Sequence, residues 1–336
     1  MLLAPRPKTA LGLALIAASL IVVSSAAASE PIAEHGPTAD DAAVPADPGG
    51  EVPPVPNPSP LFKRGSSTVS GFSGPTLRWK WQRFAAADYF ITGAGGALTL
   101  ATAIIKPRSV HAFSGGILFD DSVRNVLRAH SLQARYDFRD ASDVGLSLSV
   151  TWPFFADALT SAWWYRGSND VAEQMALIDL ETLAIAGAAQ GLTNTIVSRQ
   201  RPYGPDCGSS GLPARSIDCQ SSQEYRSFFS GHATFSFAGA ALICVHHFEN
   251  DLLGSPWDAL SCAGGYAVAA TTSTFRVVGD MHYTSDVLLG ALVGTAIGYG
   301  VPLLHYRSVL PSGASHSDLK LMVVPAAGGV GVVGIF

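Results

Sequence analysis

The 336-residue chain is rich in hydrophobic residues, which make up 48% of it, while charged residues make up only 14%. The formal net charge is -5, and no basic cluster is interleaved with aromatic side chains, so a nucleic-acid partner is not expected. A composition this apolar predicts a large helical core or burial in a membrane, in one large domain or two small ones.

The N-terminus carries a targeting pattern. Arg6 and Lys8 form a positive region, an apolar stretch runs from Ala10 to Val23, and Ala26-Ala27-Ala28 offers small residues for cleavage. We therefore predict a signal peptide over residues 1–28 and export to the periplasm or cell envelope. An uncleaved membrane anchor is the alternative.

Both ends of the chain differ in composition from its middle. Residues 29–62 are rich in proline and acids, as in EVPPVPNPSP, and predict a disordered linker that cannot bury enough apolar surface to fold. Residues 311–336 end in KLMVVPAAGGVGVVGIF, whose β-rich flanks around a Gly-Gly turn predict a hairpin. Pro325 suggests that one of its strands lies at an edge.

Between these ends, residues 63–310 contain apolar segments that are each long enough for a helix. They are rich in Ala, Gly, Ser and Leu and show no β-type alternation, which predicts an all-α bundle of about six core helices. The expected helices are Tyr89–Ile105, Val144–Thr160, Ala176–Val197, Ala233–Phe248, Trp257–Phe275 and Val287–Leu304.

Whether this bundle spans a membrane is left open by the sequence. Several segments are long enough, but Asp179 and Glu181 are costly in lipid unless they face inward. If successive segments span alternately and the motif loops face out, the most basic stretch, Lys106 to Arg139, lies on the side opposite to the usual bias. The two interpretations are a soluble periplasmic bundle and an inner-membrane bundle in which one apolar segment does not span. The glycines of GAGGA, Gly93 to Ala97, are expected to serve helix packing, because their spacing does not match a dinucleotide loop.

Four cysteines fit an exported protein in part. Cys207 and Cys219 flank a loop rich in Gly, Ser and Pro and are candidates for a disulfide. Cys244 and Cys262 lie in apolar segments and are expected to be buried thiols, with pairing as an alternative.

Two clusters of chemically competent residues lie at junctions between the expected helices. Arg201 precedes Pro202, which ends a helix, and a planar guanidinium there can bind phosphate in a bidentate manner or simply complement the helix dipole. Ser230-Gly231-His232 opens another helix, where free backbone N–H groups can bind an anion. This position predicts an anion-binding site with an acid beside it.

The third cluster is FRVVGDMHYTSD, which lies between two apolar segments. His282 and Asp286 are four residues apart, so the carboxylate can hold the imidazole by one ring nitrogen, and Arg276 is close in sequence. Asp280 is expected to be solvated or to cap a helix. We expect no metal, because zinc-type spacings are absent and two arginines beside His232, Asp280, His282 and Asp286 would repel a cation.

The order and spacing of these clusters resemble a known signature. Arg201-Pro202, Ser230-Gly231-His232 and Arg276-x5-His282-x3-Asp286 are similar to the three-part pattern K-x6-R-P, P-S-G-H, S-R-x5-H-x3-D of the type 2 phosphatidic acid phosphatase / vanadium haloperoxidase superfamily. The resemblance covers about residues 85 to 305 and implies a helical bundle with its site at the helix ends.

Three positions depart from that pattern. Asn194 stands where the family has Lys, two helical turns before Arg201, and an amide brings no charge to the anion. Arg199 is near but is expected to project from a different side. Phe229 and Phe275 replace the Pro and Ser of the other two motifs. A weakened or non-catalytic member that binds anionic lipid is therefore an alternative.

The resemblance implies a metal-independent phosphatase with a phosphohistidine intermediate. His282 would be the nucleophile, Asp286 would orient it, and His232 would act as acid and base. The groups implied to bind phosphate are Arg201, Arg276, Ser230, Gly231 and Asn194.

The implied substrate is a phosphorylated lipid, such as phosphatidate or an isoprenoid diphosphate, or a small phosphomonoester. The apolar composition and the aromatic run Trp163-Trp164-Tyr165 favour a lipid at a membrane surface, with the site outside the cytoplasm. No cofactor is expected. A vanadate-dependent haloperoxidase, in which His282 would ligate vanadium, is the alternative chemistry.

Overall fold

A computed structural model describes residues 75–107, 113–210, 212–220, 222–307, 320–326 and 329–335. The predicted signal peptide and linker lie outside the described residues. The chain divides into two units at Gly74, and the second unit, Pro75–Phe336, holds the helical bundle described below.

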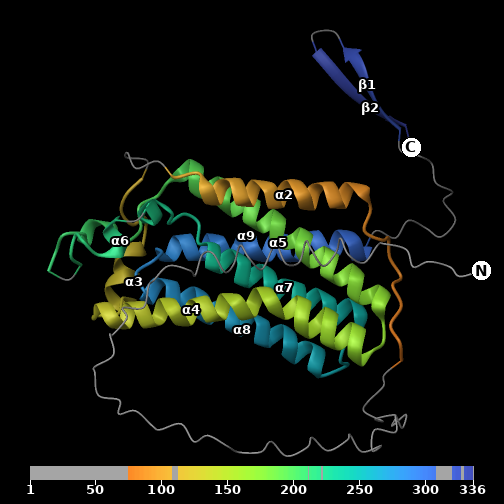
Figure 1. Cartoon of the computed structure of the whole chain (residues 1–336), viewed down its shortest axis with the longest axis horizontal. Coiled ribbons are helices and arrows are strands. Elements are labelled where there is room, and N and C mark those ends of the chain that lie inside the picture. The colour runs from red at the N-terminus through yellow and green to blue at the C-terminus, as the bar shows by residue number, and fades with distance from the viewer. Residues whose placement is uncertain are drawn as a thin grey trace, which may run out of the picture. The chain divides into compact units, whose positions relative to one another are not determined.

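The bundle consists of long helices that lie side by side (Figure 1). All of the expected helices are present, so the all-α prediction is confirmed. Their bounds are α2 Ala86–Ile104, α4 Leu132–Trp152, α5 Asn169–Val197, α7 Gly231–Asn250, α8 Trp257–Val278 and α9 Thr284–Arg307. Shorter elements lie in the connections, and these are α3 Asp120–Leu127, η2 Gly204–Asp206, α6 Ile217–Gln220 and η3 Ser222–Tyr225.

The largest difference from the predicted elements is in α4. This helix begins at Leu132, twelve residues before the expected start at Val144, because Ser131 caps it by accepting a hydrogen bond from the Ala134 N–H (3.1 Å). Its first half is rich in charged residues, which hid it from a search for apolar segments. At Pro153 the helix continues as a π-helix, η1, to Tyr165.

Helix α7 is the central element and packs against α4, α5, α8, α9 and η1. Most of its side chains are small, so the neighbouring helices approach its backbone closely. On α9, the glycines Gly290, Gly294 and Gly298 recur every four residues and face α7. A Cβ atom at Gly294 would lie 2.2 Å from the Thr234 carbonyl oxygen, so α9 can lie this close to α7 only with glycine there.

This close contact gives a test of the packing. Gly294→Ala is expected to lower the free energy of unfolding by about 1–3 kcal/mol, because the new methyl group overlaps the α7 backbone. Gly300→Ala is the matched control on the same helix, since nothing lies within 4 Å of its Cβ position. The control should be neutral or stabilising by up to about 1 kcal/mol, as alanine favours the helix. Equal effects of the two variants in reversible unfolding would contradict the packing.

Histidines and acids pair inside the half of the bundle that contains the C-terminal ends of α7 and α9. His246 contacts Asp179 Oδ1 (2.7 Å) and the Tyr306 hydroxyl (2.7 Å), and His305 contacts Glu181 Oε2 (2.7 Å). Asp179 and Glu181 thus face inward, as α5 requires in either environment. These pairs satisfy charges that would otherwise be buried alone.

Two disulfides are present. Cys207–Cys219 closes the loop after α5, as predicted. Cys244 and Cys262 also form a disulfide, so the prediction of buried free thiols for this pair was wrong. The reason is geometric: α7 and α8 pack directly against each other, which brings the two Cα atoms to 4.4 Å.

The C-terminal segment contains two strands, β1 Lys320–Ala326 and β2 Gly329–Ile335. They pair antiparallel, with Pro325 opposite Val330, and thus form the expected hairpin.

In the bundle, α5 and α9 are long and apolar enough to cross a membrane by length and composition. Large apolar side chains are also exposed along the bundle, including Phe90, Ile104, Trp164 and Leu304.

Candidate active site

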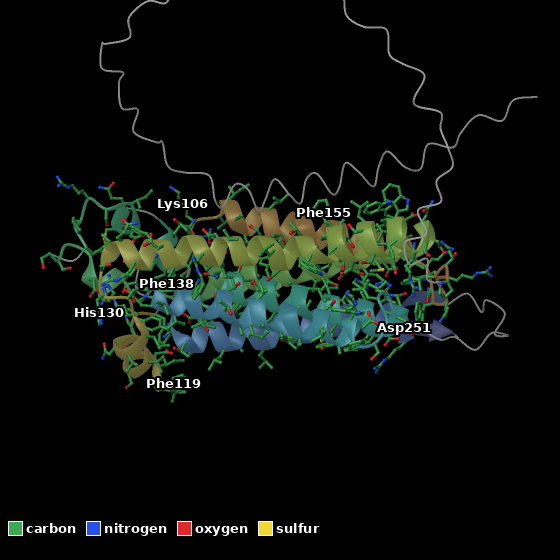
Figure 2. All side chains as sticks on the ribbon, turned by 90° about the horizontal axis from the view of Figure 1, so that it is seen from below. Lys106, Phe119, His130, Phe138, Phe155 and Asp251 are labelled. Atoms are coloured by element: carbon green, nitrogen blue, oxygen red, sulfur yellow. A yellow bond between two sulfur atoms is a disulfide. The ribbon has the colours of Figure 1, made fainter. Side chains whose placement is uncertain are left out.

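Three segments that are far apart in the sequence converge at one end of the bundle. They are the loop after α5, the N-terminus of α7 and the α8–α9 connection. This is the end that carries His130 and Phe119, and Asp251 marks the opposite end (Figure 2). The three clusters predicted from the sequence lie in these segments and meet here.

Two arginines supply the positive charge. Arg201 and Arg276 are both buried, and their Nε atoms have no hydrogen-bond partner within the described part of the chain. Arg276 donates to Ser142 Oγ (2.9 Å), while the partner found for Arg201 is the sulfur of Met281 (3.2 Å). Buried guanidinium groups with unused donors favour binding of an anion.

The N-terminus of α7 lies beside these arginines. Ser230 is the N-cap, its hydroxyl accepting a hydrogen bond from the Ala233 N–H (3.4 Å), and His232 stands in the first turn. Ser230 is also fixed to α9, because its N–H donates to the Asp286 carbonyl (3.1 Å). The free N–H groups of this helix end add partial positive charge to the site.

His282 is held in one orientation. Its Nδ1 lies 2.7 Å from the carbonyl oxygen of Ser227, which can only accept, so Nδ1 carries the proton and the Nε2 lone pair is left for chemistry. Burial lowers the pKa of His282 well below 6.5, and the charges of Arg201, Arg276 and His232 lower it further. The imidazole is therefore neutral at neutral pH, which is the state in which a histidine can act as a nucleophile.

The lowered pKa of His282 predicts a loss of stability in acid. The unfolded chain takes up a proton at this residue near pH 6.5 while the folded chain does not, so the free energy of unfolding falls as the pH drops below about 6.5. The contribution of His282 is up to about 2 kcal/mol at pH 5. Reversible unfolding at pH 7.5 and pH 5 should show a larger loss in wild type than in His282→Gln. Equal losses would contradict a neutral buried imidazole.

Asp286 supports His282 in a different way from the expected one. Its carboxylate lies 4.0 Å from His282 Nδ1, and its Oδ2 accepts from the Ser227 hydroxyl (2.5 Å) and the Tyr283 N–H (3.0 Å). Ser227, whose carbonyl holds the imidazole, thus connects Asp286 to His282. The Asp286 carboxylate therefore fixes Ser227 and Tyr283, which flank His282, in addition to lying near the imidazole itself.

Arg199 is a structural centre of the site that the sequence did not reveal. It was expected to project from a different side, but it is fully buried and binds Asp286 Oδ1 (2.5 Å) and Asp120 Oδ2 (2.9 Å). The guanidinium lies against the Tyr283 ring, 4.1 Å from its centroid. Ser198, in the left-handed conformation, ends α5 and lets the chain turn so that Arg199 points inward.

The expectation that Asp280 is solvated or caps a helix was wrong. Asp280 is fully buried, and its carboxylate binds Arg124 Nε (2.7 Å) and Arg128 Nε (2.8 Å). Both arginines come from the segment before α4, which joins the α8–α9 loop through these bonds. Sequence spacing gives no sign of this pairing, because the partners are more than 150 residues apart.

Asp143 on α4 is a further member of the site that no motif contains. Its Oδ1 lies 2.6 Å from His232 Nε2 and 3.2 Å from the Arg276 guanidinium. About 45% of its side chain is exposed, so it stands at the open edge of the cluster. A lone acid in a charged stretch carries no signal of function in one sequence.

Asn194 is buried beside the second motif. Its amide donates to the Phe229 carbonyl (3.2 Å), directly before Ser230, and its Oδ1 has no partner among the described residues. The structure therefore gives Asn194 a role in holding the start of α7. The family pattern suggests a phosphate contact for this position. The Asn194 amide group would then have to donate to the phosphate as well as to the Phe229 carbonyl.

The comparison with known proteins decides the family. Residues 176–310, from α5 to just past α9, match the model of the PAP2 superfamily. These residues form a PAP2 superfamily domain. The three motifs all fall within the matched residues, whereas α2 and the whole of α4, including Asp143, lie before them. No solved structure gives a significant match.

Two curated relatives match this PAP2 protein. One is lipid A 1-phosphatase of Porphyromonas gingivalis, 27% identical over 171 residues, which are 50% of this chain and 32% of the relative. The other is the probable diacylglycerol pyrophosphate phosphatase 1 of Schizosaccharomyces pombe, 31% identical over 108 residues, which are 30% of this chain and 36% of the relative. The chain thus spans about a third of the length of the curated relatives it matches.

Proposed function

We propose that this PAP2 protein is a phosphatase that hydrolyses a phosphate monoester or diphosphate of a lipid, through a phosphohistidine at His282. The observation that carries the proposal is the convergence of a neutral, oriented His282 with two buried arginines and His232 at one end of the bundle. Such a cluster combines a nucleophile, an acid and a binding site for the transferred phosphoryl group.

The first chemical step is attack on phosphorus. The Nε2 lone pair of His282 forms the N–P bond in line with the leaving oxygen, and the P–O bond to the lipid breaks. His232 gives a proton to the departing oxygen. Asp143 holds the His232 imidazole in one orientation at the open edge of the site. Burial, together with the charge of Arg276, lowers the pKa of His232 to about 4, and the negative charge of a bound phosphate would raise it, so that His232 takes up its proton with the substrate.

The second step regenerates the enzyme. His232, now without its proton, accepts one from water, and the water oxygen attacks phosphorus as the N–P bond breaks. Inorganic phosphate leaves, and both histidines return to their starting states. The same residue serves as acid and then as base, as reversal of the proton transfer requires.

Charge that develops on the phosphoryl oxygens needs fixed donors. Arg201 and Arg276 supply two guanidinium groups, and Ser230 and the Gly231 N–H add the helix N-terminus, so the field is in place before the substrate arrives. Asn194 would add an uncharged donor where the family pattern has a lysine. The missing charge predicts weaker phosphate binding than a lysine-containing relative has.

The surface of the bundle and the names of the relatives support the proposed substrate class and location. Both relatives are named for phosphorylated lipids. Two helices that could span a membrane, and many exposed apolar side chains, support membrane association. Two disulfides suit an oxidising compartment, which supports a site outside the cytoplasm.

A panel of substrates tests this function. Phosphate release by the purified full chain is measured with phosphatidate, an isoprenoid diphosphate and a soluble phosphomonoester. Turnover of one or both lipids, faster than of the soluble ester, is the expected result. Release from the soluble ester alone would remove the lipid assignment, and release from none would contradict the phosphatase. Peroxidase activity that appears only with vanadate would favour haloperoxidase chemistry.

A further inference from the structure

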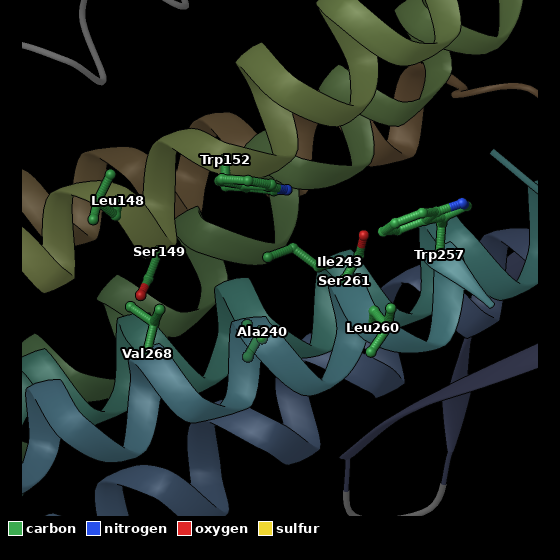
Figure 3. Close-up of a pocket in the computed structure, with 11 residues that line it drawn as sticks. Leu148, Ser149, Trp152, Ala240, Ile243, Trp257, Leu260, Ser261 and Val268 are labelled. Atoms are coloured by element: carbon green, nitrogen blue, oxygen red, sulfur yellow. The ribbon is translucent and has the colours of Figure 1, made fainter. Parts of the chain in front are cut away.

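An apolar groove lies outside the catalytic cluster, between α4, α7 and α8. It has a volume of about 360 Å³, and its lining is almost entirely hydrocarbon. Figure 3 shows Leu148 and Trp152 on one wall, Trp257 and Leu260 on the other, and Ile243 of α7 between them. The outward-facing members of this lining are about half exposed.

This groove is separate from the phosphate-binding residues. At Gly145 a Cβ atom would lie 2.1 Å from Thr272 Oγ1, so α4 and α8 touch there. The members of the candidate site on these two helices, Asp143 and Arg276, lie on one side of this contact. The groove begins on the other side, at Leu148 and Val268, where the helices diverge over α7.

The length of the groove along α8 matches the hydrocarbon thickness of one bilayer leaflet. Its lining on α8 runs from Trp257 to Val268, twelve residues separated by eleven helical rises. At 1.5 Å per residue this is about 16 Å. Half of a bilayer hydrocarbon core is about 15 Å.

Tryptophans mark the outer end of the groove. Trp257 begins α8, and Trp163 and Trp164 end η1, where Arg166 donates to the Asp251 carbonyl at the end of α7 (2.7 Å). Trp79 and Trp81 pack on Tyr306, at the same end of the bundle. Five of the six tryptophans of the chain therefore gather at the end far from the catalytic cluster. Such a gathering is typical of a membrane interface.

We propose that the groove binds one hydrocarbon chain of a membrane phospholipid, which enters from the leaflet opposite the catalytic end. Its headgroup lies beside Trp257, and the chain runs along α8 to Val268. This lipid is not the substrate, because the α4–α8 contact separates it from Arg201 and His282. The proposal does not depend on the phosphatase activity.

A glycine in the lining allows a specific test. Gly264 lines the groove and nothing lies within 4 Å of its Cβ position, so a leucine there has room to occupy part of the groove. Gly264→Leu keeps the helix, because leucine is a better helix former than glycine. Gly93→Leu on α2 is the matched control: its Cβ position is equally free, and it lies on an exposed face without the groove.

The full chain is reconstituted into phosphatidylcholine vesicles that contain a small share of phosphatidylcholine with a photoreactive group on one acyl chain. After illumination, the adducts are located by mass spectrometry. The expected result is a concentration of adducts on residues 257–268 in wild type and in Gly93→Leu, and a fall to the level of other exposed helix faces in Gly264→Leu. Thermal unfolding of Gly264→Leu shows whether the variant is folded.

Three results would overturn the proposal. Adducts spread evenly over all exposed helices, and unchanged in Gly264→Leu, would make the groove an ordinary lipid-facing surface. Adducts on the other exposed helices but none on residues 257–268 in wild type would mean that no lipid chain enters the groove. A chain that takes no adduct at all would not be embedded in the bilayer.

Discussion

His282→Ala is expected to abolish phosphate release from every substrate that the wild-type protein turns over. The loss should reach about 10⁴-fold or more, because the Nε2 lone pair of His282 is the proposed nucleophile and alanine offers no atom to replace it. Both kcat and kcat/KM should fall together, since the alanine variant keeps the arginines and can still bind the phosphate.

His130→Ala is the control for this loss. His130 is exposed at the same end of the bundle, and its removal should leave kcat unchanged (Figure 2). Thermal unfolding of the two variants separates a lost nucleophile from a lost fold. Undiminished turnover by a folded His282→Ala protein would remove His282 from the mechanism.

Arg199→Met is expected to have the largest effect on stability. Arg199 is fully buried between Asp120 and Asp286, so its removal leaves two carboxylates in the core without their cation. Breaking a buried ion pair in this way costs about 3–5 kcal/mol. Activity should fall as well, because Asp286 and Ser227 hold the loop that orients His282.

The same substitution at an exposed ion pair is the control. Arg83 binds Asp170 at the surface with 62% of its side chain exposed, and Arg83→Met should cost less than about 1 kcal/mol. If Arg199→Met does not fold, Arg199→Lys keeps the charge but not the two-pronged geometry and should lie between wild type and Met. Equal stability of Arg199→Met and Arg83→Met in denaturant unfolding would contradict the central role of Arg199.

Features that depend on local pattern were predictable from the sequence. Runs of small apolar residues revealed the long helices, and the spacing from Arg276 through His282 to Asp286 revealed the family. The loop cysteines Cys207 and Cys219 were also paired correctly. Each of these signals lies within a short stretch of chain, where helix geometry or loop length sets the distance between residues.

Features that depend on long-range contacts were not predictable. Arg199 binds Asp120 across 79 residues, and Asp143 reaches His232 across 89. Asp280 looked like a solvated acid because its arginine partners lie in a segment far earlier in the chain. The pairing of Cys244 with Cys262 likewise follows from the packing of α7 on α8, which one sequence does not fix.

The positioning of His282 combines the two kinds of information. Its spacing to Asp286 suggested a direct contact, yet the Ser227 carbonyl is the nearer partner of Nδ1. Ser227 lies in the second motif, RSFFSGH, three residues before Ser230, where nothing in its spacing distinguishes it. Either partner places the proton on Nδ1 of His282, but in the structure the Ser227 carbonyl, and not the Asp286 carboxylate, accepts it in a hydrogen bond.

The central claim is that His282 carries the phosphoryl group. The most direct test traps this state in His232→Ala, which can form the N–P bond with a substrate whose leaving group needs no proton but lacks the base for hydrolysis. After a rapid quench with a radiolabelled activated phosphomonoester, acid-labile label is expected on the peptide that contains His282, close to one phosphate per chain. Absence of label, or label on a different residue, would contradict the account.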